Sequence, residues 1–240
     1  MHATSDMPYP TIPAPTVTSL LHHTIIEHFI SHGHAPSIEL LASLLDQPRE
    51  AVAAALRTLQ DEHGVVLHPA SSEIWVCHPF SSAPTNFWVR NARRGWWGNC
   101  AWCSMGVIAL LGGDASVTTT LGGESTQVTV DVVDGAISHG ELLVHFPIPM
   151  SHAWDNVVYT CGNMLLFESG EAIDRWCERH DMPRGDAQPL AKIWEFARVW
   201  YGRHRDPAWK KWSAAEAREI FARFSLTGPT WELRDTGERF

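Results

Sequence analysis

The sequence predicts an α+β protein in which three helices precede an antiparallel sheet that is itself flanked by helices. Apolar residues recur at helical spacing through residues 17–32, and two further helical patterns follow directly. Segments between residues 115 and 146 alternate apolar and polar residues between glycine turn signals, which is typical of antiparallel strands. Amphipathic helical patterns then return between residues 170 and 224. These three observations together define the predicted fold class.

The three N-terminal helices are bounded by recognisable capping residues. The first helix is predicted from about Val17 to His32, and Gly33 ends it. Ser37 can cap a second helix, and Pro48 is suited to the start of a third, which ends before Gly64. The spacing of these signals predicts short connections, so we expect the three helices to pack together.

Two short strands, Val65–Leu67 and Ile74–Val76, complete a winged-helix-like module over residues 17–80. Such a module can bind DNA through its third helix. That helix, Arg49–Gln60, carries only two arginines, and the chain has a net charge of −9. Because phosphate binding needs positive charge, DNA is not the expected partner, and a structural or dimerising role is favoured.

The domain boundaries follow from composition. Residues 1–16 are proline-rich and polar and predict a disordered lead-in, whereas the serine- and proline-rich residues 78–85 predict a linker. The second domain is then expected over residues 86–240. The chain shows neither an apolar run long enough to cross a membrane nor the apolar core of a signal peptide. A cytoplasmic protein with no membrane partner is therefore expected.

The second domain is predicted to begin with a strand, Phe87–Trp97, broken at Gly95, followed by a buried helix over residues 100–111. Three strands of an antiparallel meander come next. They are Ala115–Leu121, Thr126–Val133 and Glu141–Phe146. A short helix and a short strand are then expected, followed by three longer helices. These elements are Ala153–Tyr159, Met164–Phe167, Gly170–His180, Leu190–Tyr201 and Ser213–Phe224. The last helices are candidates for a homodimer face or a lid.

The chain has five cysteines, an odd number that favours free or metal-binding thiols over a disulfide framework. Cys77 lies on a predicted strand and Cys177 in the middle of a predicted helix. Free cysteine is among the most buried residue types, so these two are interpreted as core residues without a chemical role.

Cys100, Cys103 and Cys161 are the candidate site residues. The first two would lie in the first turn of the helix over residues 100–111, where free N–H groups and the helix dipole favour a thiolate. Cys161 stands beside a glycine and before another apolar run. We expect the three thiols to meet in one pocket and to hold a soft metal ion, because thiolates are soft ligands.

Other meanings of the Cys100-x-x-Cys103 motif remain open at this stage. A structural zinc site usually has four ligands, but no second CxxC or HxxxH partner follows. A thioredoxin-like dithiol is expected after a strand in a βαβ unit, whereas an antiparallel meander follows here. The third possibility is that the cysteines are buried and have no chemical role.

The strings around the cysteines resemble the organomercurial (alkylmercury) lyase family. They are Asn99–Cys103 running into Ile108–Gly112, and Thr160–Gly162 running into Leu166–Phe167. The family also carries an N-terminal winged-helix-like module, and the resemblance covers roughly residues 17–180. It implies an enzyme that breaks a carbon–mercury bond without a cofactor. Thiolates would bind mercury, a nearby acid would protonate the leaving carbon, and small-molecule thiols would be partners.

The family's site consists of a cysteine, an aspartate three residues later and a distant second cysteine. The resemblance carries these positions onto Cys100, Cys103 and Cys161, so this chain has a cysteine where the family has its proton-handling aspartate. Cys100 and Cys161 would then be the metal-binding thiolates. A cysteine can also carry a proton, but its ordinary pKa of about 8.5 makes it a different acid, and it adds a third soft ligand. Cys103 would be that ligand or the proton donor.

Two functions are therefore carried forward. The first is an organometal lyase that releases a hydrocarbon and leaves thiol-bound Hg(II), by a three-thiol variant of the family's reaction. The second is a soft-metal binding or sensing protein, for mercury or copper, in which cleavage is lost or altered. A winged-helix regulator whose second domain senses the metal is a third possibility.

A second alignment register would put Cys103 at the family's first cysteine and Gly106 at the aspartate. The register that begins at Cys100 is preferred because it keeps the apolar helix in phase with Gly112. Further candidate proton carriers are His152, Asp155 and Glu168. Four tryptophans flank the cysteines and could wall a dry pocket or pack in the core. They are Trp96, Trp97, Trp102 and Trp154.

Overall fold

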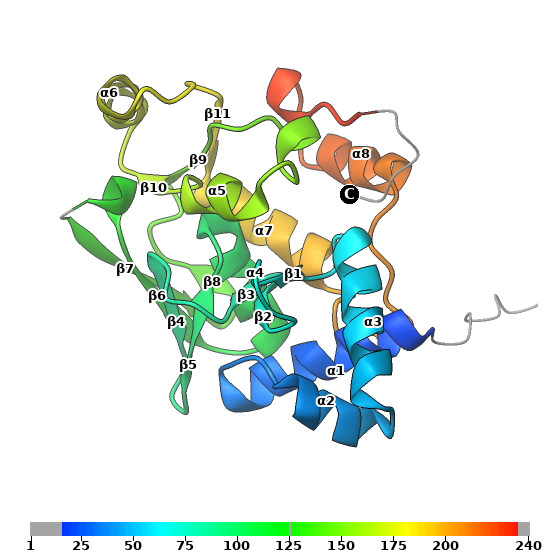
Figure 1. The fold of residues 1–240 in the computed structure, drawn as a ribbon. Helices are drawn as coiled ribbons and strands as arrows, with labels where there is room; N and C mark the ends of the chain where they lie inside the picture. The colour runs from blue at the N-terminus through cyan, green and yellow to red at the C-terminus, as the bar shows by residue number, and fades with distance from the viewer. Residues whose placement is uncertain (1–15, 125, 235–240) are drawn as a thin grey trace, which may run out of the picture.

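The computed structural model describes residues 16–124 and 126–234. Apart from Thr16, the predicted lead-in over residues 1–16 lies outside the described residues. Helices α1 to α3 gather at one end of the molecule, and α6 lies at the opposite end (Figure 1). Within the described part, no helix combines the length and the apolar character that crossing a membrane would require. The predicted α+β class, with helices around antiparallel strands, is confirmed.

The N-terminal helices begin and end close to the predicted residues. Their bounds are α1 Val17–His32, α2 Ile38–Leu45 and α3 Arg49–Asp61. Thr16 and Ser19 form a reciprocal capping box at the start of α1, and Gly33 ends that helix with φ 85°. Ser37 caps α2 as expected. The hairpin of β1 (Val66–Leu67) and β2 (Ile74–Cys77) follows. Assignment of this part to the winged-helix class stays a prediction.

The predicted linker over residues 78–85 is instead part of the main sheet. It contains β3 (Phe80–Ser81), which pairs with β2 on one side and with β5 (Gly95–Gly98) on the other. Serine and proline indicated turns correctly, but the buried Phe80 between them stacks on Phe29 of α1 with ring centroids 5.1 Å apart. The predicted domains, 17–80 and 86–240, therefore share a sheet and a core. The division of the chain into these two domains stays a prediction.

The main sheet has eight strands in the order β1-β2-β3-β5-β4-β6-β7-β8. The bounds not yet given are β4 Phe87–Arg90, β6 Ala115–Thr120, β7 Gln127–Val133 and β8 Ala136–Ile137. The strand predicted over Phe87–Trp97 is a hairpin, in which β4 pairs with β5 and Trp88 lies opposite Trp97. Gly95 leaves space for the Trp88 ring, because a Cβ atom there would come within 2.1 Å of that ring.

The third predicted meander strand, Glu141–Phe146, belongs to a different sheet. Asp134 and Gly135 both have positive φ, 49° and 78°, so a tight turn folds β8 back onto β7 immediately. The later segment forms β9, the central strand of a second sheet with the order β10-β9-β11. These strands are β9 Leu143–Phe146, β10 Leu166–Phe167 and β11 Asp186–Pro189.

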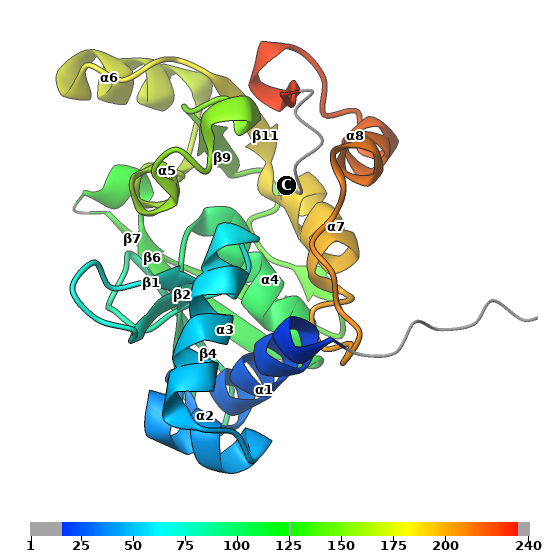
Figure 2. The same ribbon diagram turned by 45° about the vertical axis from the view of Figure 1, so that its right-hand side comes forward.

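Helix α4 (Ala101–Leu111) is almost entirely buried and packs between strands of the main sheet and α7, as Figure 2 shows. The remaining helices are α5 Val157–Gly162, α6 Gly170–His180, α7 Leu190–Tyr201 and α8 Ala214–Arg223. Short 3-10 turns cover Leu121–Gly123, Met150–His152 and Pro229–Trp231. The helix predicted from Ala153 starts four residues later because Asn156 provides its cap. This shift puts Cys161 inside α5.

Candidate active site

The first two candidate cysteines lie at the N-terminus of α4, as predicted. Cys100 is the N-cap residue, and its Sγ accepts a hydrogen bond of 3.2 Å from the backbone N–H of Cys103. Gly98 closes the turn from β5 into this helix, since a Cβ there would lie 2.8 Å from the backbone of Ser104. The two thiols are therefore held by backbone geometry as well as by their burial.

Cys161 reaches the same place from α5. The backbone N–H of Ala101 donates to the carbonyl of Met164 at 3.1 Å, which joins the start of α4 to the segment that follows α5. The Met164 Sδ lies 3.4 Å from the Cys100 Sγ. The cavity that results is lined by all three candidate cysteines. The two remaining cysteines, Cys77 and Cys177, are buried outside that cavity.

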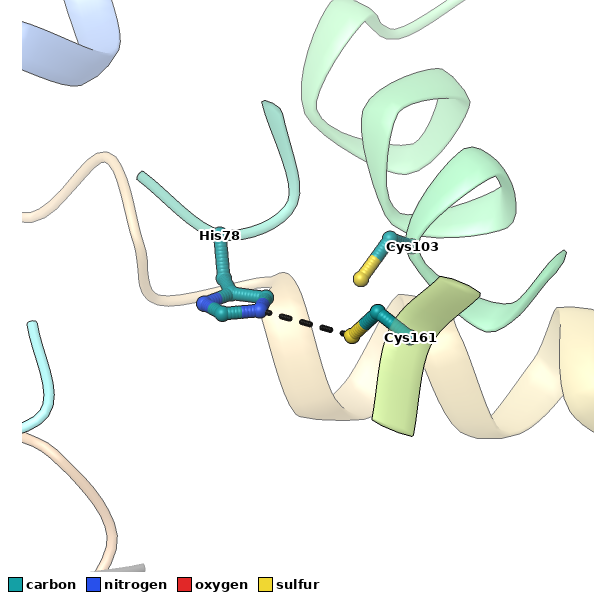
Figure 3. Close-up of side chains that lie close together, drawn as sticks. All are labelled: His78, Cys103 and Cys161. Carbon is teal, nitrogen blue, oxygen red and sulfur yellow. Dashed lines mark hydrogen bonds between the residues drawn. The ribbon is translucent and has the colours of Figure 1, made fainter. Parts of the chain in front are cut away.

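His78 is a site residue that sequence reasoning missed. Its imidazole points toward the sulfurs of Cys103 and Cys161 (Figure 3), and one ligand atom from each of the three lies within 4.8 Å of the others. His78 Nε2 is 3.7 Å from Cys161 Sγ and 3.1 Å from Asn99 Nδ2. The only local signal was a histidine beside a proline at the end of a buried strand, and that is weak on its own.

The cavity has a volume of about 50 Å³, enough for a small group beside the sulfurs. Its lining residues are His78, Cys100, Trp102, Cys103, Met150, Ala153, Trp154, Val157, Thr160, Cys161, Met164, Trp200, Tyr201, His204 and Lys211. Of the four tryptophans considered, Trp102 and Trp154 line it. Trp96 instead donates its Nε1–H to the Phe29 carbonyl at 2.7 Å, and Trp97 tilts against Trp88.

The proton carriers suggested by the sequence lie elsewhere. His152 Nδ1 and Asp155 Oδ2 lie 2.7 Å apart at the surface, where Arg234 pairs with Asp155, and neither residue lines the cavity. Glu168 lines a different depression beside β10. His152 and Asp155 lie outside the cavity because the 3-10 turn at Met150–His152 sends Met150 inward and leaves the His152 side chain at the surface.

The wall that faces the thiols comes from the C-terminal part of the chain. The Tyr201 hydroxyl, at the end of α7, is 3.3 Å from Cys103 Sγ. The His204 ring packs against the Tyr201 ring with centroids 4.9 Å apart. Lys211 Nζ lies 3.8 Å from the centroid of a Trp154 ring and donates to the His63 carbonyl at 3.1 Å.

Comparisons with known proteins agree with this geometry. The sequence profile of MerB, alkylmercury lyase, matches residues 80–202, just over half of the chain. The chain belongs to the alkylmercury lyase family. A solved structure described as the mercury-bound form of MerB2 is similar, with a TM-score of 0.64 and 18% identity. That match covers 79% of this chain and 92% of the other, and it shows a shared fold. No curated protein sequence matches the chain.

The resemblance places Cys103 at the position of the family's aspartate, and this assignment stays a prediction. The second register would have put Gly106 there. A Cβ atom at Gly106 would lie 2.3 Å from the Tyr201 ring, so a larger side chain does not fit. The preference for the register that begins at Cys100 stays a prediction.

The three thiols of the cavity differ in their ionisation. Burial raises the pKa of Cys100, and the neighbouring Cys103 and Cys161 thiols raise it further. Burial also opposes ionisation of Cys103. Hydrogen bonds from Cys100, Cys161 and Tyr201 nevertheless hold the Cys103 pKa well below its ordinary value. The Cys100 hydrogen bond acts to lower the pKa of Cys161, but the Cys103 hydrogen bond, burial and the Cys103 charge together raise it well above its ordinary value. Of the three thiols, Cys103 is therefore the one whose ionisation the pocket favours.

The basic groups of the cavity lose charge on burial. Burial lowers the pKa of His78 to about 4, and it lowers that of His204 well below the ordinary value. Both imidazoles are therefore neutral at pH 7. Burial also lowers the pKa of Lys211 to about 7, while the Cys103 and Cys161 thiols oppose that shift. The pocket thus combines soft sulfur ligands, two neutral imidazoles and a lysine whose ammonium form is partly populated at pH 7.

Proposed function

We propose that the protein cleaves the carbon–mercury bond of small organomercurials by thiolate coordination and protonolysis. The observation that carries this proposal is the convergence of Cys100, Cys103 and Cys161 on one cavity, in the order of the family's site residues. Soft sulfur ligands suit mercury, and the surrounding tryptophans exclude water from a reacting carbon. No cofactor is required by this reaction, and mercury enters as substrate and leaves as product.

The ionisation of the thiols supports an order of events. The Cys103 thiolate is the first sulfur to bind the R–Hg⁺ ion. Cys161 then binds as a second sulfur, and its thiol proton moves to the leaving carbon, which also keeps the electron pair of the carbon–mercury bond. The balance is R–Hg⁺ + Cys–S⁻ + Cys–SH → R–H + Hg(S–Cys)₂. Cys100 is the third sulfur, available to hold Hg(II) until a small-molecule thiol removes it.

This order differs from the roles that the family resemblance implied, in which Cys100 and Cys161 were the thiolates. The cause is the replacement of the aspartate, because a third thiol redistributes the charge among the sulfurs. Tyr201 supports the new assignment through its hydroxyl, which can donate to a Cys103 thiolate at 3.3 Å.

The test is a product assay on the reduced, purified chain. Methylmercury or phenylmercury is supplied with excess small thiol, and methane or benzene is measured by gas chromatography. Release with multiple turnovers is expected. A protein that binds the mercurial but releases no hydrocarbon over many hours would remove the lyase proposal.

The alternative function is a soft-metal binder or sensor for mercury or copper(I). The observation that favours it is the ligand set of Cys103, Cys161 and His78, whose ligand atoms already lie within 4.8 Å of one another. Three donors without the family's carboxylic acid would retain a metal tightly. Native mass spectrometry during metal titration separates the two functions, since one tightly held ion without hydrocarbon release supports the binder.

A further inference from the structure

The wall of the cavity opposite the thiols carries basic groups that the proposed cleavage does not use. Lys211, His204 and His78 all line the cavity, and all three lie outside the matched segment, residues 80–202. They converge from the β2–β3 connection and from the segment between α7 and α8. The cavity thus has a basic side that lies outside the segment matched by the family profile.

Lys211 is held in place at this wall. Its ammonium group lies over a Trp154 ring at 3.8 Å and donates to the His63 carbonyl at 3.1 Å. The His63 ring stacks on Trp154 with centroids 4.4 Å apart, so the lysine and its two supports form one packed unit. Lys211 also lines a neighbouring depression together with Thr16, Ser19 and Trp209, so it stands where the two hollows meet.

The composition of the cavity lining indicates what this cation attracts. Among the described residues that line the cavity there is no aspartate or glutamate. The acidic groups that favour the charged form of Lys211 are the thiols of Cys103, Cys161 and Cys77. When mercury binds the Cys103 and Cys161 sulfurs their negative charge is neutralised, and a carboxylate on the bound compound can then take over the stabilisation of the Lys211 cation. Charge attraction is stronger in such surroundings than in water.

We propose that Lys211 is a carboxylate subsite, so that this protein prefers mercury compounds that carry a carboxylate near the metal. The inference rests on the proposed function, because it names the substrate class of the same pocket. His204 and His78, whose rings are neutral at pH 7, add polar edges to that subsite without adding charge. Two sources of the carboxylate share this chemistry. It can belong to the hydrocarbon, or to a small thiol already bound to mercury.

The experiment compares matched pairs of compounds. In one arm, 4-carboxyphenylmercury is compared with phenylmercury, both with 2-mercaptoethanol. In the other arm, methylmercury is supplied with mercaptoacetate or with 2-mercaptoethanol. Each pair is assayed on the wild type and on K211M, K211R and K210M. Lys210 is an exposed neighbour outside the cavity, so K210M is the matched control.

We expect the wild type and K210M to favour the carboxylated member of at least one pair by roughly 10-fold or more in kcat/KM. The preference should fall to about 1 in K211M and return in part in K211R. The arm that responds identifies the source of the carboxylate. A wild type that shows no preference within either pair overturns the proposal even if K211M fails to fold. A preference for the carboxylated compound that K211M retains also overturns it.

Failure of the proposed function is recognised separately. The absorbance of the mercury–thiolate bond gives the affinity for each compound whether or not cleavage follows. If no hydrocarbon is released, the lyase proposal falls, and the ratio of affinities across the same variants then decides the carboxylate subsite. Tighter binding of the carboxylated compound that disappears in K211M supports the carboxylate subsite. Equal affinities for the two compounds of each pair reject it.

Discussion

The two walls of the cavity come from parts of the chain with different relationships to the family. The thiols of Cys100, Cys103 and Cys161 lie within the segment that matches alkylmercury lyases, residues 80–202. His78 and Lys211, on the facing wall, lie outside it. Cys100 and Cys103 are held at the start of α4, where the Cys100 sulfur accepts from the Cys103 backbone, and Cys161 lies in α5. We expect the sulfurs to supply metal binding and the residues outside the matched segment to influence which compounds are accepted.

The largest expected effect tests the thiol wall. Replacing Cys161 by serine removes a soft ligand and a proton source, so hydrocarbon release should fall at least roughly 1,000-fold. The matched control is Cys177→Ser, which lies in the same matched segment. The Cys177 thiol donates to the Pro183 carbonyl at 3.5 Å, outside the cavity, and a hydroxyl can do the same. If both variants lose activity equally, the assignment of the site to the cavity is wrong.

A smaller effect is expected on the facing wall. His78→Ala removes a nitrogen that lies within 4.8 Å of the Cys103 and Cys161 sulfurs. Loss of such a supporting group typically lowers metal affinity or activity by about 10- to 100-fold. Competition with a small chelating thiol would measure the Hg(II) affinity. His68→Ala is the control, because His68 stacks on Trp75 away from the cavity. If the Hg(II) affinity of His78→Ala is unchanged, His78 is not a metal ligand and only the sulfurs bind the ion.

The contact between α4 and α7 joins the two walls, and it depends on Gly106. A Cβ atom there would meet the Tyr201 ring at 2.3 Å, so Gly106→Ala should lower the free energy of unfolding by about 1–3 kcal/mol. Gly162→Ala is the matched control. It lies in α5 with nothing within 4 Å of an added Cβ, so it should be neutral or stabilising by up to about 1 kcal/mol. Urea denaturation of both variants checks the contrast. Equal effects would mean that Tyr201 moves aside at no cost.

Local signals in the sequence predicted local structure well. Ser37 and Gly33 defined helix ends, and the position of Cys100 as an N-cap followed from the apolar helix behind it. The order of the family's site residues then indicated Cys161 as their partner. These features depend on neighbours along the chain or on a resemblance that spans it.

The features that sequence reasoning missed depend on long-range packing. β3 is only two residues long and is defined by its partners on both sides, so its composition resembled a linker. His78 and Cys161 are 83 positions apart and meet only because the main sheet carries the β2–β3 connection to α5. Lys211 gave no signal, because a lysine near a helix start is ordinarily exposed.

The smallest expected effect concerns a histidine behind the facing wall. His22 on α1 is buried and stacks on Trp209 with ring centroids 3.6 Å apart, and its Nδ1 has no hydrogen-bond partner among the described residues. Burial, aided by the nearby Lys211, lowers its pKa to about 3. Because the unfolded chain binds a proton below about pH 6.5 and the folded chain does not, stability must fall as pH decreases from about 6.5 toward 3.

His22→Phe keeps the stack on Trp209 and removes this titration. Between pH 7 and pH 5.5 the wild type should therefore lose about 1 kcal/mol more stability than His22→Phe does. Urea denaturation at the two pH values measures the difference. His23→Phe is the control, because that neighbouring ring lies at the surface of α1 and contacts the Arg205 carbonyl instead. Parallel pH profiles for wild type and His22→Phe would mean that His22 is protonated in the folded state. The region behind Lys211 would then be better hydrated than its packing indicates.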